Sequence, residues 1–573
     1  MSRLLVTGGV VVDGSRAPRR AADVLIEDGR VLAIAPSLAD SVTDAETVDA
    51  RGRVVAPGFI DVHTHFDAQA LWDPGLSPSP AHGVTTVIAG NCGFALAPSS
   101  RASDVDYLQR MMARVEGIPL EAIREGIDWS WRSVPEYLSR IEGDVAPNIG
   151  FLAGHSSIRR EAMGERAATH RADASEMEAM EGLLAAALDA GALGLSSSLG
   201  SVHLDGDGRP VPSRLATDDE LVRLAALVAR SPAVAIQLTT PGAVDGFPPE
   251  EVELMIALSR ASERAVNWNM LVVRGNRPEF TDRQLAASHT AADAGARVYA
   301  LMLPHTQRLR FTLKSGAILA NLPGWTEVLS LPHQARLDAL RDGDTRRALR
   351  EGASSGQGFV GAVGRSIARM ELADTSEEAN RHFVGLTVGE IAEALDSTPV
   401  DTLLDLALAD DLAAGFRSPR SDQEDETWRE RRRAWEDPYV VLGASDAGAH
   451  LDMMCGSVYT TSLLGEGVRQ RGLLSLEEAV AMLAHDPAQL YGLVDRGELR
   501  EGAAADVVVF DPDVVGPGPE HLVHDLPGGC ARVVAGAEGV HDVLVNGVPV
   551  IRDGRPTAAR PGTLLRAGKD AAA

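Results

Sequence analysis

The sequence of 573 residues contains few cysteines, few aromatic residues and almost no lysine. Its three cysteines, Cys92, Cys455 and Cys530, are widely spaced and form no CxxC pair, which argues against a disulfide framework and a zinc-finger module. No apolar run approaches the ~18 residues that a membrane-spanning helix needs. Because the segment Met1–Val6 also lacks the features of a signal peptide, we expect a cytoplasmic protein without a membrane partner.

Basic residues are outnumbered by acidic ones, 54 Lys and Arg against 81 Asp and Glu, which gives a formal net charge of −27. Such a chain repels phosphate backbones, so nucleic acid is not expected as a partner. The apolar fraction of 45% is sufficient for a large core, and 56 glycines with 31 prolines predict many tight connections. The composition therefore indicates a large globular protein, and we expect its partner to be a small molecule.

Short antiparallel strands are expected at both ends of the chain. Near the N-terminus, apolar runs are separated by turns at Asp13-Gly14 and Asp28-Gly29, which is typical of hairpins. The C-terminal part repeats this pattern around Asn546-Gly547. Since chain ends often lie close together, we predict one small β-sandwich domain built from residues 1–58 and 496–573.

The middle of the chain, residues 59–495, alternates strands with helices. Apolar runs such as Val84–Gly90 and Val234–Thr239 alternate with amphipathic stretches such as Met177–Ala190. Repeated β-α units of this number predict an α/β fold, a (β/α)8 TIM barrel, with a long insertion at about 305–438. An open doubly wound sheet is the alternative, but the sequence has no G-x-G-x-x-G or P-loop motif to support it.

The sharpest motif is His63-Thr64-His65, which ends the apolar run from Phe59. Residues i and i+2 of a strand point to the same side, so both imidazoles face one point at the carboxyl end of the first barrel strand. Active sites of TIM barrels lie at that end, and neutral imidazole is a common ligand of zinc and iron. We therefore predict that His63 and His65 bind a metal, rather than being two polar residues of a turn.

Four further residues follow later strands. Cys92 is a candidate metal ligand, with a buried free cysteine as the alternative. Asp446 is a candidate ligand and proton acceptor, or a cap of the next helix, and His450 lies close enough along the loop to share its site. His155 is a ligand, a proton shuttle, a substrate contact or a structural histidine.

Taken together, these motifs resemble the amidohydrolase superfamily. The strand-end His63-x-His65, the late Asp446 and the split terminal β domain carry this resemblance over nearly the whole chain. Gly90-Asn91-Cys92-Gly93 and Ser445-Asp446 are similar to the N-acyl-D-amino-acid deacylase branch. That branch implies a zinc-dependent amide hydrolase in which Asp446 acts as the base.

The sequence departs from this branch at two strands. Such deacylases normally carry a histidine at the end of each of strands 5 and 6, where this sequence has Gln237 and Asn267-Trp268-Asn269. Carboxamide oxygens are weaker ligands than imidazole for zinc and similar metals. Other superfamily members bridge two metals with a carbamylated lysine on strand 4, but Gly191–Ser197 contains none. We expect Gln237 to supply an oxygen ligand or to orient the substrate.

Three further segments resemble the TIM-barrel non-haem diiron monooxygenases of platensimycin and platencin biosynthesis. They are Phe66–Pro74 with Ser77-Pro78-Ser79, Asn267-Trp268-Asn269, and Ser445–His450. This resemblance implies two Fe ions, dioxygen, an electron donor and hydroxylation of a coenzyme A-linked substrate, a diterpenoid in the known group. The metal ligands that it suggests are His63, His65, Cys92, Gln237 and Asp446. The residues expected to act on the substrate are Asp446, His450 and His155, and Asp67 is a further candidate ligand or partner of a ligand.

These motifs are therefore compatible with three functions. A diiron monooxygenase of secondary metabolism is the first expectation, because it accounts for the retained strand-1 and strand-8 residues together with the missing histidines. A metal-dependent amidohydrolase, such as an N-acyl-D-amino-acid deacylase with zinc, is the second. An inactive barrel that only binds a partner is the third, and a homo-oligomer is compatible with each of them.

Overall fold

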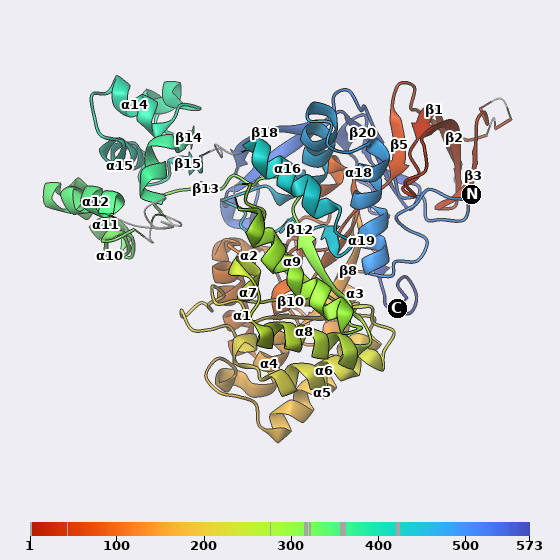
Figure 1. Ribbon diagram of the computed structural model, residues 1–573, viewed down its shortest axis with the longest axis horizontal. Coiled ribbons are helices and arrows are strands. Elements are labelled where there is room, and N and C mark those ends of the chain that lie inside the picture. Colours follow the sequence, from red (N-terminus) through yellow and green to blue (C-terminus); the bar gives the residue numbers. More distant parts are fainter. Residues whose placement is uncertain are drawn as a thin grey trace.

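Eight parallel strands form a curled sheet in the middle of this computed structural model (Figure 1). Across the sheet they are β6 (Phe59–Asp61), β7 (Val84–Ala89), β8 (Asn148–Gly154), β9 (Gly194–Ser198), β10 (Ala235–Thr239), β11 (Ala265–Leu271), β12 (Val298–Met302) and β16 (Val440–Leu442). The short strand β23 (Leu564–Leu565) also pairs with β8. The structure describes residues 3–39, 41–42, 44–275, 277–314, 319, 322–355, 363–419 and 424–572.

The two edge strands of this sheet, β6 and β16, meet just beyond their carboxyl ends. Thr64 and Ala447 form a parallel bridge, and the backbone N–H of His65 donates to the carbonyl of Ala447 over 2.8 Å. Helices α18 (Leu476–Leu483) and α19 (His485–Leu490) pack against both edge strands. This arrangement agrees with the predicted barrel, and it brings the first and last strand ends together.

The strand sequences explain why the sheet is buried. Every residue of β7 and β8 is buried, as expected for parallel strands that are covered on both faces. Helix α5 (Ala174–Asp189) shows the complementary helical pattern, because its buried residues recur three or four positions apart and its N-terminus is capped by Asp173. Helices that pack against the sheet include α5, α6 (Asp218–Ala229), α8 (Pro249–Ser262), α9 (Pro278–Asp293), α16 (Glu424–Trp435) and α18.

Other helices connect these units. They are α1 (Ala102–Val115), α2 (Leu120–Gly126), α3 (Val134–Ile141), α4 (His155–Met163), α7 (Gly242–Asp245) and α17 (Tyr459–Ser462), with a π-helix at Leu463–Gln470. In the part of the chain that the structure describes, none of the helices has both the length and the apolar character to cross a bilayer.

Both ends of the chain contribute to a second sheet. Its N-terminal strands are β1 (Arg3–Val11), β2 (Arg20–Glu27), β3 (Arg30–Ala35), β4 (Glu46–Asp49) and β5 (Val54–Pro57). Its C-terminal strands are β17 (Val507–Phe510), β20 (Val540–Val545), β21 (Val548–Arg552) and β22 (Arg555–Pro556). The antiparallel pair of β5 and β17 joins the two halves. A separate pair, β18 (Gly516–Val523) and β19 (Arg532–Glu538), lies outside this sheet, and a true two-layer sandwich stays a prediction.

Between β12 and β16 the chain forms a lobe that projects from the barrel (Figure 1, green to teal). It contains α10 (Trp325–Leu329), α11 (His333–Arg341), α12 (Gly343–Ser355), α14 (Val388–Ala394), α15 (Pro399–Ala409) and the small sheet of β13 (Arg310–Phe311), β14 (Glu371–Asp374) and β15 (Gly415–Arg417). The lobe has its own apolar core, which includes Trp325 and Phe416. It corresponds to the insertion expected at about 305–438.

Candidate metal centre

His63 and His65 lie directly after β6 and are almost completely buried. Their rings are in edge contact, with centroids 5.4 Å apart, and Thr64 between them is tied to β7 because its N–H donates to the carbonyl of Ile88. The Nε2 atoms of both rings make the contacts described below, whereas both Nδ1 atoms are buried without a hydrogen-bond partner in the described part of the chain. The HxH spacing therefore places two imidazoles in one site, as expected.

Cys92 and Asp446 face the same two rings. The Cys92 sulfur lies 3.4 Å from Nε2 of His63, and Asp446 Oδ1 lies 3.3 Å from that atom and 3.6 Å from Nε2 of His65. Ligands at the usual zinc distances of about 2.0 Å for nitrogen and about 2.3 Å for sulfur would be about 3.3–3.5 Å apart around a tetrahedral ion. The three donors of His63, His65 and Cys92 all lie within 4.8 Å of one another, so these residues fit a bound metal.

Backbone conformation and a backbone hydrogen bond fix the loop that carries Cys92. Gly90, at the end of β7, has φ +75°, and a Cβ there would lie 2.3 Å from the carbonyl oxygen of Leu152. Cys92 itself has φ +55°, and its N–H donates to Oε1 of Gln237 over 2.6 Å. Burial raises the pKa of the Cys92 thiol well above its usual value, and the nearby acidic groups add to this shift. Metal binding at this residue would therefore be coupled to loss of the thiol proton.

Asp446 lies between the imidazoles and solvent. Its side chain is 29% exposed, whereas those of His63 and His65 are 0% and 1% exposed. Although burial opposes its charge, the contacts with the two imidazoles lower the pKa of Asp446 well below the usual range. The preceding residue, Ser445, anchors the loop by donating from Oγ to Oδ2 of the buried Asp61 over 2.5 Å. Asp446 can therefore remain ionised and accept a proton at the open side of the site.

Gln237 holds the loop of Cys92 by a hydrogen bond. Its Oε1 accepts from the N–H of Cys92, and its Nε2 donates to Oδ1 of Asn269 over 2.6 Å. The expected oxygen ligand is thus already hydrogen-bonded, and we assign Gln237 a positioning role. Asn267 differs, because its Nδ2 donates to the carbonyl of Ile236 and to the hydroxyl of Tyr491, whereas its Oδ1 is buried without a hydrogen-bond partner in the described part of the chain.

His155, directly after β8, is hydrogen-bonded at both ring nitrogens. Its Nδ1 lies 2.9 Å from the hydroxyl of Ser197, and its Nε2 lies 2.8 Å from Glu220 Oε1. The guanidinium of the buried Arg159 also binds the Glu220 carboxylate. Because both ring nitrogens already have partners, these contacts favour the structural alternative over a metal ligand, and the roles of proton shuttle and substrate contact stay predictions.

The sequence analysis missed two residues of this region. The carboxylate of Glu116, the residue after α1, lies with Oε2 3.4 Å from Nε2 of His65. His203 packs against Phe94, and burial lowers its pKa to about 4, with the His65 charge as a further cause. Neither residue ends a barrel strand or belongs to a short motif. His450, which the sequence did suggest, is joined to Glu116 because its N–H donates to the Glu116 carbonyl over 2.5 Å.

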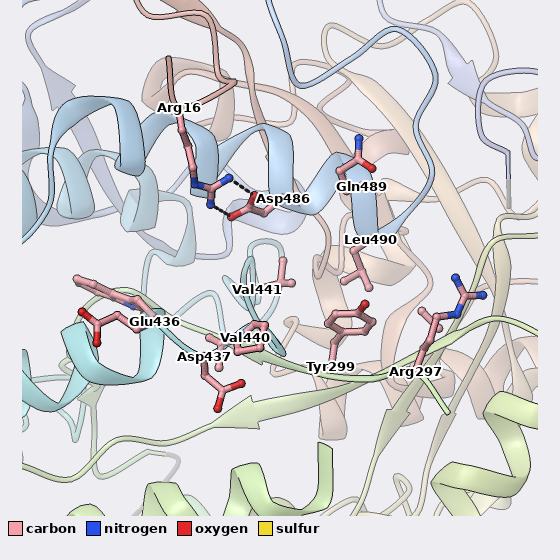
Figure 2. Close-up of a pocket in the computed structure, with 13 residues that line it drawn as sticks. Arg16, Arg297, Tyr299, Glu436, Asp437, Val440, Val441, Asp486, Gln489 and Leu490 are labelled. Atoms are coloured by element: carbon pink, nitrogen blue, oxygen red, sulfur yellow. Dashed lines mark hydrogen bonds and ion pairs between the residues drawn. The ribbon is translucent and has the colours of Figure 1, made fainter. Parts of the chain in front are cut away.

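A separate pocket of about 470 Å³ lies at the other end of the sheet (Figure 2). Ala265, Arg297 and Val440, at or next to the amino ends of β11, β12 and β16, line it, and the ion pair of Arg16 with Asp486 lies at its edge. In TIM barrels this end is associated with stability, whereas chemistry takes place at the carboxyl ends of the strands. The pocket therefore does not change the assignment of the metal centre.

The sequence profile of the Amidohydrolase family matches residues 46–551. The chain belongs to the amidohydrolase family. This amidohydrolase is 30% identical to the N-acyl-D-glutamate deacylase of Alcaligenes xylosoxydans xylosoxydans, over 98% of this chain and 96% of that protein. The membership confirms the resemblance inferred from the HxH motif and from Asp446.

Two solved structures are similar over almost the whole amidohydrolase chain. The N-acyl-D-glutamate deacylase of Bordetella bronchiseptica, in complex with zinc and a phosphonate that mimics the tetrahedral intermediate, has 26% identity and a TM-score of 0.60, covering 98% of this chain and 99% of that one. A D-aminoacylase described with a binuclear metal centre has 24% identity and a TM-score of 0.64, with the same coverage. The second likeness supports the fold.

These relatives overturn the expected diiron monooxygenase. Relatives that match nearly the full chain include two N-acyl-D-amino-acid deacylases and a D-aminoacylase, so the predictions of an oxidoreductase and of antibiotic biosynthesis were wrong. Part of the first segment that suggested an oxygenase has a structural use instead. Asp73, for example, accepts from Nε2 of Gln69 and from Oγ of Ser77, which fixes the turn after the HxH motif. The two expected iron ions had rested on that resemblance alone, whereas the relative from Bordetella binds zinc.

Proposed function

We propose that this chain is a zinc-dependent hydrolase that removes the acyl group from N-acyl-D-amino acids. The observation that carries the proposal is the convergence of two imidazoles, a thiol and a carboxylate from the first, second and last strands of the barrel. The similarity to deacylases over the full length supports the reaction class. An inactive barrel would have no need to keep Asp446 ionised beside both imidazoles.

His63, His65 and Cys92 would hold the metal. Imidazole and thiolate donors suit zinc, and Asp446, whose Oδ1 lies close to both rings, is the candidate for a further donor. A bound zinc would polarise the scissile carbonyl and make water more acidic. Oε1 of Gln237 accepts from the N–H of Cys92 and Nδ2 of Asn269 donates to its sulfur, so both amides support the site by holding Cys92.

Asp446 is the residue that moves protons. Its low pKa keeps the carboxylate charged, so an oxygen of this group can take a proton from the attacking water. The same group then returns the proton to the leaving amine, which balances the hydrolysis. Because the two histidines are buried and Asp446 is partly exposed, the substrate would approach from the side of Asp446.

The test is hydrolysis by zinc-loaded protein of N-acetyl-D-glutamate, N-acetyl-D-aspartate and N-acetyl-D-methionine, with each L enantiomer as a control. Release of free amine from at least one D compound, loss of this activity with a chelator and recovery with zinc are expected. Equal rates with D and L compounds would overturn the stereochemical part of the proposal. Absence of hydrolysis by a zinc-loaded protein across a broader N-acyl-D-amino-acid panel would overturn the reaction.

A further inference from the structure

Glu116 is a buried carboxylate that reaches the metal centre from outside the strand ends. The residue is 3% exposed, and its Oε2 lies 3.4 Å from Nε2 of His65. Its backbone is fixed against the loop of the last strand, because its carbonyl accepts from the N–H of His450 and a Cβ on Gly117 would lie 3.1 Å from atoms of His450. The carboxylate is therefore held beside His65 by its surroundings.

The charged side chains near Glu116 are acidic and do not compensate a buried carboxylate. In the described part of the chain, the charged groups that act on its carboxyl are Asp446 and Asp67, both acidic, and no arginine or lysine pairs with it. Burying an ionised carboxylate is costly unless a cation or hydrogen bonds compensate it. Asp104, at the other end of the same helix, shows the usual solution, because Arg101 and Arg160 both pair with it.

Two carboxylates thus flank one imidazole nitrogen. Glu116 Oε2 and Asp446 Oδ1 lie 3.4 Å and 3.6 Å from Nε2 of His65, which are separations expected between ligands of one ion. The charges of both acids also raise the pKa of the Cys92 thiol. A cation bound beside His65 would compensate the charges of both carboxylates.

We propose that Glu116 is a metal-binding residue of this chain, which supplies a donor where Gln237 and the segment Asn267-Trp268-Asn269 stand in place of the histidines expected on strands 5 and 6. The donor set would then consist of two imidazoles, one thiolate and two carboxylates. This inference rests on the proposed function only in requiring a bound metal. It makes no assumption about which amide is cleaved.

The test compares zinc affinity, measured by chelator competition, in the wild type, Glu116→Gln and Asp104→Asn. Glu116→Gln keeps the size of the side chain and removes its charge, and we expect a loss of affinity of at least about tenfold. The metal-free variant should be as resistant to thermal unfolding as the wild type or more so, because in the described part of the chain no arginine or lysine pairs with the carboxyl that is replaced. Asp104→Asn should do the opposite, lowering the melting temperature and leaving zinc affinity within about threefold.

A second readout follows the cobalt-substituted protein. The thiolate-to-cobalt absorption from Cys92 should persist in Glu116→Gln while the visible ligand-field bands change, and Glu116→Asp should bind zinc with intermediate affinity. Unchanged zinc affinity in Glu116→Gln would overturn this inference and leave the hydrolase proposal standing. A loss of zinc affinity in Asp104→Asn equal to that in Glu116→Gln would have the same consequence. Tight zinc binding that depends on Glu116, in a protein that hydrolyses no amide, would retain the inference and remove the proposed function.

Discussion

Two buried clusters of this amidohydrolase place histidine beside carboxylates, and they differ in how their charges are compensated. In the cluster of His155, Glu220 and Arg159, both ring nitrogens have partners and the guanidinium neutralises the acid. Although burial opposes its charge, contacts with His155 and Arg159 lower the pKa of Glu220. In the metal centre, by contrast, burial and the charge of Asp446 raise the pKa of Glu116 well above its usual value.

This difference separates a structural cluster from a binding site. A group of buried charges that is complete in itself has nothing left to offer a ligand, whereas one that lacks positive charge needs a partner from outside the chain. The histidines alone do not reveal this, because His65 and His155 are equally buried and follow strands of the same sheet. The partners of each ring decide its role.

The largest effect should come from Asp446→Asn. The amide keeps the shape of the side chain but cannot accept the proton of the attacking water, so kcat for the preferred N-acyl-D-amino acid should fall by about 10³-fold. Steady-state assays of zinc-loaded protein measure this change, and elemental analysis establishes that the variant still carries metal. A metal-loaded variant with more than a tenth of the wild-type kcat would show that another residue is the base.

Breaking the compensated cluster should act on stability instead. Glu220→Gln leaves the guanidinium of Arg159 buried without its negative partner, and we expect the free energy of unfolding to fall by about 3–5 kcal/mol. Urea unfolding measures the loss. Zinc affinity of the folded variant should stay within about threefold of the wild type, and a selective loss of zinc affinity without loss of stability would contradict the proposed contrast between the clusters.

A third effect concerns the thiol. Cys92→Ser replaces a soft sulfur ligand by a hydroxyl that is hard to ionise, so zinc affinity should fall by at least about 100-fold, beyond the effect of changing a residue that only orients a ligand. The matched control is Cys455→Ser, since Cys455 is also buried and free but lies in a separate apolar cluster with Val458. Similar zinc affinities in the two variants would remove Cys92 from the ligand set.

The parts of this picture that could be predicted from sequence have a local origin. The alternation of two along a strand places His63 and His65 on one side, and apolar runs with punctuating turns mark the strands. Cys92 and Asp446 were suggested because each follows a strand, and parallel strands end on the same face of a barrel. These relations depend on residues close in sequence, together with one general property of the fold.

Glu116 and the role of His155 could not be predicted in this way. Glu116 reaches the site from the end of α1, a position that depends on how the helix packs against the loop of His450. His155 is satisfied by Glu220, 65 positions away in the sequence. The missing histidines were also given too much weight as evidence against a hydrolase. The sequence could not show that the Gln237 amide already holds the Cys92 loop.

Among the residues around the metal centre, Gln237→Ala should have the smallest effect on metal binding. The side chain accepts from the N–H of Cys92 and donates to Asn269, so its loss leaves a buried donor unpaired and should lower the free energy of unfolding by about 1–3 kcal/mol. Zinc affinity should fall by less than about tenfold, because the Cys92 thiolate itself remains. Chelator competition on Gln237→Ala and Cys92→Ser in parallel makes the comparison direct. An equal loss of zinc affinity in the two variants would instead make Gln237 a ligand and show that its carbonyl oxygen, which accepts from the N–H of Cys92, can also bind the metal.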